Sequence, residues 1–485
     1  MSESSIESLQ LRLYCHGLGD CNLIGVPDDK GDAFWILIDC GIHTSAAGGS
    51  ARIREVVTNI LSITKRLDVI VGTHEHWDHI SGFLQAKDLF GQFSVGEVWF
   101  AWTEDPSNPA ARKIDKFKGD AMAALADTAL KLHDNPRMAE SAQGIDALLG
   151  FVFGLKGEKV RDAREDLRAL SPNVRHLAPG TIVPLPPQAS AIRAYVLGPP
   201  HDTSLFGIED STTQTYRMSP TLGALKNGLA AQAGELRIRN DALAPFDEGA
   251  GLALSSMLGG AKLDAPHAFD FLSRCYAGPV GKGAPAKDVA VPADQDWRRI
   301  DSDWLGGGTD LALQLDSSTN NTSLVLAIEI VATGRVLIFA ADAQVGNWKS
   351  WASVSFADPA GGAAIIGADL LRRTVFYKVG HHGSRNATLS QNGLELMTSP
   401  DLTAFVPTDE VMAKKVGWSD IPADKLLARL REKTAGRVIL SDADWVQQPS
   451  QPIGVELGGS LQKVTVRHSN PAPFQGAPYV EIRIG

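Results

Sequence analysis

The segment from residue 69 to residue 83, VIVGTHEHWDHISGF, constrains this chain most strongly. An apolar run typical of a buried strand leads directly into a cluster formed by His74, His76, Asp78 and His79. Alternate residues of an extended chain project from the same face, so His74 and His76 can bind one metal ion together. As the chain turns into a following helix, Asp78 and His79 can hold a second ion nearby. The segment therefore predicts a two-metal site at the end of a buried strand.

The ligand types restrict which metals fit this site. Imidazole and carboxylate groups suit zinc, manganese or iron. The four cysteines, Cys15, Cys21, Cys40 and Cys275, are too few and too scattered for a structural zinc module or a disulfide framework. We expect them to be small buried hydrophobic residues in a reducing compartment. We therefore expect two divalent ions as cofactors, zinc first, with manganese or iron as alternatives.

Composition excludes several classes of protein. The chain has 485 residues, 44% hydrophobic and 21% charged, which rules out a disordered or fibrous protein. No apolar run approaches the ~18 to 20 residues of a membrane span, and the start MSESSIESLQ lacks the pattern of a targeting signal. We expect a cytoplasmic protein with no membrane partner. The net charge of −10 disfavours long duplex nucleic acid as a ligand, because such binding depends on phosphate neutralisation.

Strand and helix patterns alternate in both halves of the chain. A helix is expected at 51–67, between apolar strands, and another at 423–434. Residues 322–331 and 335–340 read as a strand hairpin. This order predicts a mixed α/β sandwich with helices outside the sheets.

The H-x-H-x-D-H pattern of residues 74–79 resembles the signature of the metallo-β-lactamase superfamily. The resemblance implies an α/β fold, the four-layered αββα sandwich of that superfamily, as a single domain over residues 1–485. We expect two helical or irregular insertions, at about 103–190 and 202–320. A C-terminal α/β part is expected at about 390–485.

The resemblance also implies roles for residues outside the motif. ILIDCG supplies Asp39, which is expected to orient the ligands, and VLIFAADAQ supplies Asp342 as the bridging carboxylate. The segment VFYKVGHHGSRNAT supplies His381 and His382. We assign His382 as the ligand and His381 as a neighbour that donates a proton or contacts substrate, and the reverse assignment stays open. YVLGPPHDT supplies His201 as a sixth ligand, with an exposed loop histidine as the alternative.

A narrower resemblance is to the hydrolase domain of the ComEC-type DNA-uptake proteins and their free-standing relatives. It rests on HGLGDCNLI, NNTSLVLAI, FAADA and KVGHHGS, over roughly residues 10–102 and 320–445. Those proteins usually have glutamine where Leu18 stands, so we expect Asp20 to be structural. The membrane channel of the uptake proteins has no counterpart in this sequence.

These resemblances imply a hydrolase in which two metal ions activate a hydroxide, with Asp78 and His381 as catalytic residues. Lys378, Ser384 and Arg385 are further candidates for contact with an anionic substrate, although Lys378 also suits a buried strand partner or a surface lysine. We expect phosphodiester substrates, either a nucleotide or a nucleic acid. Hydrolysis of a small carbonyl substrate (a lactone, thioester or lactam) is the first alternative, and a non-catalytic metal-binding or regulatory protein is the second.

Overall fold

The computed structural model describes residues 8–27, 32–46, 48–133, 142–146, 149–150, 158–207, 300–359, 361–415, 418, 420–447, 464–469 and 479–485. The chain divides into two compact units. The larger unit comprises Met1–Met122, Ala147–Arg217 and Leu313–Gly485, and the smaller comprises Ala123–Asp146 and Met218–Ala312. The described residues of the smaller unit are helical. Most of the expected second insertion, residues 208–299, lies outside the described residues.

The first sheet of the larger unit has eight strands in the order β16–β17–β1–β2–β3–β4–β5–β6. Their bounds are β1 Leu9–Tyr14, β2 Cys21–Pro27, β3 Ala33–Cys40, β4 Arg66–Gly72, β5 Ser94–Ala101, β6 Val174–Leu177, β16 Val464–Ser469 and β17 Tyr479–Ile484. Neighbouring strands from β16 to β3 are antiparallel, whereas β3, β4, β5 and β6 run parallel. The two chain ends of this unit therefore meet in one sheet.

The second sheet has seven strands in the order β15–β14–β13–β10–β9–β8–β7. Their bounds are β7 Ile182–Val183, β8 Ile192–Gly198, β9 Val325–Ile330, β10 Arg335–Phe339, β13 Thr374–Lys378, β14 Thr403–Val406 and β15 Val438–Leu440. The predicted hairpin is confirmed, because β9 and β10 pair antiparallel around a turn in which Gly334 has a φ of +67°. Strands β10, β13, β14 and β15 run parallel. A short third sheet pairs β11 (Ser355–Phe356) with β12 (Ile365–Ile366).

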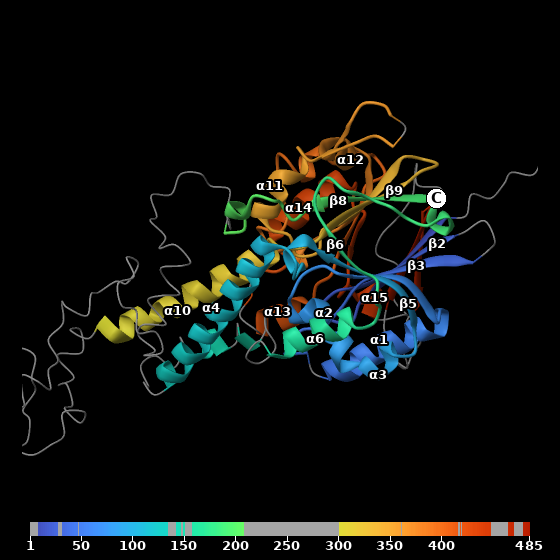
Figure 1. Ribbon diagram of the computed structural model, residues 1–485. Coiled ribbons are helices and arrows are strands. Elements are labelled where there is room, and N and C mark those ends of the chain that lie inside the picture. Colours follow the sequence, from blue (N-terminus) through green and yellow to red (C-terminus); the bar gives the residue numbers. More distant parts are fainter. Residues whose placement is uncertain are drawn as a thin grey trace, which may run out of the picture. The chain divides into compact units, whose positions relative to one another are not determined.

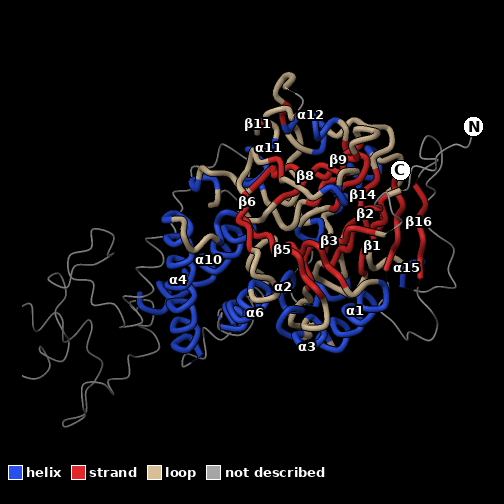
Figure 2. The backbone as a smooth tube through the Cα atoms, turned by 45° about the vertical axis from the view of Figure 1, so that its right-hand side comes forward, coloured by secondary structure: helices blue, strands red, loops and turns tan. Residues whose placement is uncertain are grey.

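The described helices belong to both units of the chain, since two of them contribute residues to the smaller unit. Their bounds are α1 Gly49–Ile63, α2 Trp77–Gln85, α3 Lys87–Phe90, α4 Pro109–His133, α6 Glu158–Arg168, α10 Ile300–Asn320, α11 Val345–Trp351, α12 Gly367–Arg372, α13 Glu410–Lys415, α14 Asp424–Lys433 and α15 Asp444–Gln447. Figures 1 and 2 show α1, α2 and α3 on one side of the paired sheets and α11 and α12 on the other. Across the described ranges, every helix is too short or too polar to span a bilayer.

Apolar side chains from both sheets form one continuous core between them. Leu11, Ile38 and Trp99 of the first sheet pack in the same buried cluster as Leu326 and Phe339 of the second. A separate cluster fills the space between the second sheet and its covering helices, and includes Tyr195, Trp348, Trp351, Tyr377 and Leu430. Burial of such apolar surface is the main favourable contribution to folding. This arrangement confirms the predicted layered α/β sandwich.

Two details of the first sheet differ from or refine the sequence-based expectation. The helix expected at 51–67 ends at Ile63, because Thr64 is extended and Arg66 already pairs with Ser94 in β4 and β5. The three described cysteines, Cys15, Cys21 and Cys40, are buried free thiols, as predicted, and Cys275 lies outside the described residues. The domain boundaries stay a prediction. The segment expected as the first insertion, at about 103–190, contains β6, α6 and β7.

Candidate metal centre

The clustered histidines lie where β4 ends. After Gly72 the chain stays extended as far as His76, whose φ of −112° and ψ of 149° precede the first residue of α2. His74 and His76 therefore lie on extended backbone, whereas Asp78 and His79 fall in the first turn of the helix. The four side chains are buried, and each residue is at most 2% exposed. This local geometry confirms the expected change from strand to helix within the motif.

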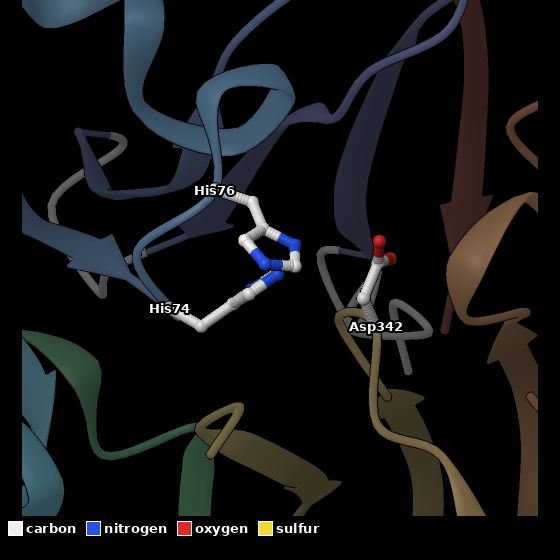
Figure 3. Close-up of side chains that lie close together, drawn as sticks. All are labelled: His74, His76 and Asp342. Carbon is white, nitrogen blue, oxygen red and sulfur yellow. The ribbon is translucent and has the colours of Figure 1, made fainter. Parts of the chain in front are cut away.

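Asp342 follows β10 and is the carboxylate that the ligand candidates share. Three sets of side chains have ligand atoms within 4.8 Å of one another: His74, His76 and Asp342; Asp20, His79 and Asp342; and Asp78, Asp342 and His382. The rings of His74 and His76 point toward the Asp342 carboxylate (Figure 3). His79 Nε2 lies 3.1 Å from Asp342 Oδ2. A carboxylate that all three sets share suits a pair of adjacent ions.

His382 belongs to these sets through its Nε2 atom, which lies 3.0 Å from Asp78 Oδ2. Its Nδ1 donates a hydrogen bond to the carbonyl oxygen of Pro407 at 2.8 Å, and this fixes the proton on Nδ1. His381 lies differently: its backbone N donates to Asp342 Oδ1 at 2.8 Å and its Nδ1 contacts Ser384 Oγ at 2.8 Å. The geometry therefore places His382 among the ligand candidates and His381 beside them.

Asp39 fixes the orientation of two histidines of this centre through hydrogen bonds. Its Oδ2 accepts a hydrogen bond from His79 Nδ1 at 2.8 Å and another from the Thr73 hydroxyl at 2.7 Å. Because that hydroxyl gives its only proton to Asp39, it accepts from His74 Nδ1, which lies 3.1 Å away. Outer hydrogen bonds of this kind fix the tautomer of metal-binding histidines. His74 thus presents an unprotonated Nε2 to the centre, and the use of Nδ1 by His79 leaves the Nε2 atom of that ring facing the centre.

The electrostatics of the centre favour a bound cation. Burial, followed by the neighbouring His79 and His76, holds the pKa of His74 well below its usual value, and burial lowers the pKa of His76 to about 3. Burial also disfavours a charged His79, but Asp342, Asp78 and Asp39 outweigh it and hold the pKa of His79 well above its usual value. A metal ion that binds beside Asp342 displaces that proton from His79.

The donor set fits a pair of divalent ions. His74 Nε2 is buried and has no hydrogen-bond partner among the described residues, which is costly unless a cation occupies its lone pair. Two atoms bound to one ion at about 2.0 to 2.2 Å can lie up to roughly 4 Å apart. The separations of 3.1 Å between His79 and Asp342 and 3.0 Å between His382 and Asp78 lie within that limit.

Asp20 and Lys378 form a buried ion pair that the sequence did not predict. The Lys378 ammonium pairs with Asp20, donates to the carbonyl oxygen of Ala341 at 3.2 Å and lies 4.0 Å from Asp342 Oδ1. The Lys378 side chain is only 1% exposed, which excludes the surface lysine considered above. The Lys378 ammonium therefore lies buried beside the carboxylates of the centre. A lysine at the end of an otherwise apolar strand, TVFYK, was the available signal.

Two glycines let backbone segments pack directly against the metal-ligand loop. A Cβ atom on Gly41 would lie 2.3 Å from the carbonyl carbon of Asp78 and 2.4 Å from His79 N. Gly19 has a φ of +140°, and its Cβ would lie 2.4 Å from the carbonyl oxygen of Gly41. Asp20 N donates to the carbonyl oxygen of Asp78 at 3.0 Å. The GLGD and IDCG turns therefore hold the start of α2 in place.

His43 and His201 lie outside the three sets of ligand candidates. His43 lies near the centre, because Asp78 and His382 both affect its pKa, which burial lowers to about 4. His201 is exposed in the turn after β8, and its ring centroid lies 5.5 Å from that of Trp102. His201 is not in any of the three sets, and its role as a ligand stays a prediction. His267 lies outside the described residues.

We predict that Gly41→Ala reduces the metal content of the purified protein by at least one ion per chain. The added methyl group would displace the peptide between Asp78 and His79, and overpacking of this kind costs about 1 to 3 kcal/mol. Elemental analysis and thermal unfolding check both effects. Gly91→Ala is the control, because Gly91 has a helical φ of −62° and its nearest neighbour atom lies 3.5 Å from the added carbon. Full metal content in Gly41→Ala would contradict the prediction.

Comparison with known proteins agrees with this geometry for the first part of the chain. Residues 17–126 match the family model described as the Metallo-beta-lactamase superfamily. The matched range contains Asp39 and the motif from His74 to His79, whereas Asp342 and His382 lie beyond it. No curated protein matches the chain. Residues 17–126 thus carry a domain of the metallo-β-lactamase superfamily, on a two-sheet α/β fold consistent with that superfamily.

Proposed function

We propose that this protein is a hydrolase that uses two divalent ions to cleave phosphodiesters in a nucleotide or a short nucleic-acid strand. One observation carries the proposal. His74, His79 and His382 each use Nδ1 in an outer hydrogen bond and present Nε2 toward the centre that contains Asp342 and Asp78. A purely structural buried histidine has no need of this shared inward orientation. The superfamily that matches residues 17–126 consists mostly of hydrolases, which supports the same class of activity.

The chain's own residues supply the geometry for hydrolysis. Two divalent ions, when bound, lower the pKa of water to near 7 and stabilise negative charge that develops on the substrate. Asp342 is placed to hold both ions, because its carboxylate is shared by all three sets of ligand candidates. Asp78 is held against His382 and accepts protons poorly, since nearby His79 and His382 lower the pKa of Asp78 despite its burial. Asp39 keeps His79 aligned through their 2.8 Å hydrogen bond.

His381 is placed to handle a proton at the leaving group. His381 Nδ1 contacts both Ser384 Oγ at 2.8 Å and Gln344 Nε2 at 3.3 Å, and these contacts leave Nε2 of that ring for another partner. The backbone of His381 is fixed against Asp342 by the 2.8 Å hydrogen bond from its N–H. An imidazole beside the centre serves as a general acid when its Nε2 carries a proton, and because burial lowers the pKa of His381, that protonated form is favoured only next to developing negative charge.

A neighbouring pocket gives room for a substrate and is lined by basic and acidic side chains in equal number. The pocket has a volume of about 560 Å³, and its lining includes Arg112, Lys116, Arg164 and Arg168 together with acidic side chains. Arg164 Nη1 lies 3.2 Å from Oε1 of Glu75, the residue between His74 and His76 in the chain. Arg164 also pairs with Glu104, Asp115 and Glu165, so its charge is already balanced by carboxylates of the pocket. The resemblance of the GLGD and HHGS motifs to ComEC-type hydrolase domains supports phosphodiesters as the substrate class.

We predict that the protein hydrolyses bis(p-nitrophenyl) phosphate and short single strands when supplied with Mn²⁺ or Zn²⁺, and that Asp342→Asn lowers turnover by at least about a hundredfold. The amide keeps the shape of Asp342 but removes the charge that both ions require. Asp424→Asn, an exposed position at the start of α14, is the matched control. Cleavage of p-nitrophenyl esters or lactones, without cleavage of phosphodiesters, would replace the proposed substrate class with the carbonyl alternative.

A second prediction concerns His381. His381→Gln is expected to keep its metal ions and to cleave unactivated dinucleotides about 10² to 10⁴ times more slowly, which is the contribution of a general acid. Cleavage of bis(p-nitrophenyl) phosphate should fall much less, because p-nitrophenolate leaves without protonation. The ratio of the two rates separates proton donation from a structural defect, which would slow both substrates equally. An equal loss would therefore remove His381 from the proposed role.

A further inference from the structure

Glu75 is a buried carboxylate of the metal-ligand loop, residues 73–76, that the proposed hydrolysis does not use. The residue is only 6% exposed. The rings of its neighbours His74 and His76 point toward Asp342 (Figure 3). The Glu75 side chain instead meets the guanidinium of Arg164, with Oε1 3.2 Å from Arg164 Nη1. Removal of the cation from a buried ion pair leaves an uncompensated charge, so the position of this carboxylate depends on Arg164.

Arg164 approaches the loop from α6, which belongs to the segment expected as the first insertion. Leu167, on the same helix, is fully buried and packs where β4 ends. A Cβ atom on Gly72 would lie 2.6 Å from Leu167 Cδ2. Arg164 and Leu167 are three residues apart and therefore share one face of the helix. That face contacts the chain on both sides of His74, at Gly72 and at Glu75.

Two further carboxylates hold the Arg164 guanidinium in place. Arg164 Nη1 donates to Glu104 Oε2 at 3.1 Å and to Asp115 Oδ1 at 3.2 Å. Burial disfavours the charged guanidinium, but Glu75, Glu104 and Asp115 outweigh burial and raise the pKa of Arg164. Glu104 follows β5, Asp115 lies on α4, and all four residues belong to the larger unit of the chain. Arg164 thus joins the metal-ligand loop to the end of β5 and to α4.

We propose that Arg164 is a positioning residue for the ion bound by His74 and His76, and that it acts by keeping Glu75 buried. This inference rests on the proposed two-metal function. Without the guanidinium, burial favours movement of the Glu75 carboxylate toward water. Because both histidines adjoin Glu75 in the chain, that movement turns their imidazoles out of the centre and weakens metal binding.

Titration of the metal-free, full-length protein with Mn²⁺ or Zn²⁺ tests the proposal. Arg164→Gln is expected to bind its ions at least about tenfold more weakly than the wild type does, as when other groups that orient metal ligands are removed. Arg161→Gln, at an exposed position of the same helix, is the matched control and should bind as the wild type does. Circular dichroism of each metal-free variant checks that it is folded.

A double variant separates positioning from a general loss of stability. In Glu75→Gln/Arg164→Gln the buried amide needs no cation, so we expect metal affinity to return to within about threefold of the wild type. The other partners tolerate the loss of Arg164, because the Asp115 side chain is 47% exposed and Glu104 Oε1 lies 3.9 Å from the Lys118 ammonium. If Arg164 served only to join α6 to Glu104 and Asp115, the double variant would bind as weakly as Arg164→Gln.

The outcomes also separate this inference from the proposed function. Wild-type affinity in folded Arg164→Gln, or no recovery in the double variant, would overturn the role of Arg164 and leave the two-metal hydrolase standing. A wild-type protein that binds no divalent ion would overturn both. If Arg164→Gln does not fold, the double variant decides alone. A folded double variant with near-wild-type affinity then supports the role, and one that is unfolded or binds metal weakly contradicts it.

Discussion

The buried carboxylates at the centre of the sandwich are the constraint on which the site depends. Asp20, Asp39, Asp78 and Asp342 are each at most 2% exposed. Burying a carboxylate without compensation costs several kcal/mol, so each one needs a cation or a set of hydrogen bonds. Lys378 compensates Asp20, and hydrogen bonds compensate Asp39. Asp78 and Asp342 face histidine nitrogens, so divalent ions there would supply the missing positive charge.

The fold brings these groups together because parallel strands end at one edge. Asp39 lies near the end of β3, His74 follows β4, Asp342 follows β10 and His382 follows β13. In each sheet the two strands run parallel, β3 with β4 and β10 with β13, so their carboxyl ends lie together. Gly41 then allows the turn after β3 to touch the start of α2 without a side chain between them. The same residues that build the sandwich therefore position the ligands.

Short-range parts of the site could be predicted from the sequence, and long-range parts could not. The segment from His74 to His79 carries its own geometry, because a buried strand and a helix start fix where each side chain points. Pairing of Asp20 with Lys378 depends on two strands in different sheets, and no local pattern encodes it. The nearness of His43 to Asp78 likewise arises only in the folded chain. Strand β6, VRHL, was missed because it is short and polar.

The fold class was accessible because apolar periodicity depends on local burial. The hairpin of β9 and β10 and the parallel strand β13 are apolar runs that remain buried in the core. The nearness of Asp316 to His76 could not be predicted in this way. Helix α10 has no metal-binding pattern in its sequence, and Asp316 approaches His76 only through tertiary structure. Contacts of this kind are visible only when the fold is known.

The spacing of the two ions is the most direct test of the account. Electron paramagnetic resonance of protein loaded with two equivalents of Mn²⁺ measures it, because ions that share one carboxylate, about 3.5 to 4 Å apart, are magnetically coupled. We predict a spin-coupled spectrum in the wild type. Two isolated Mn²⁺ signals, or a single bound ion at saturating metal, would contradict the account of Asp342 as the residue that holds both ions.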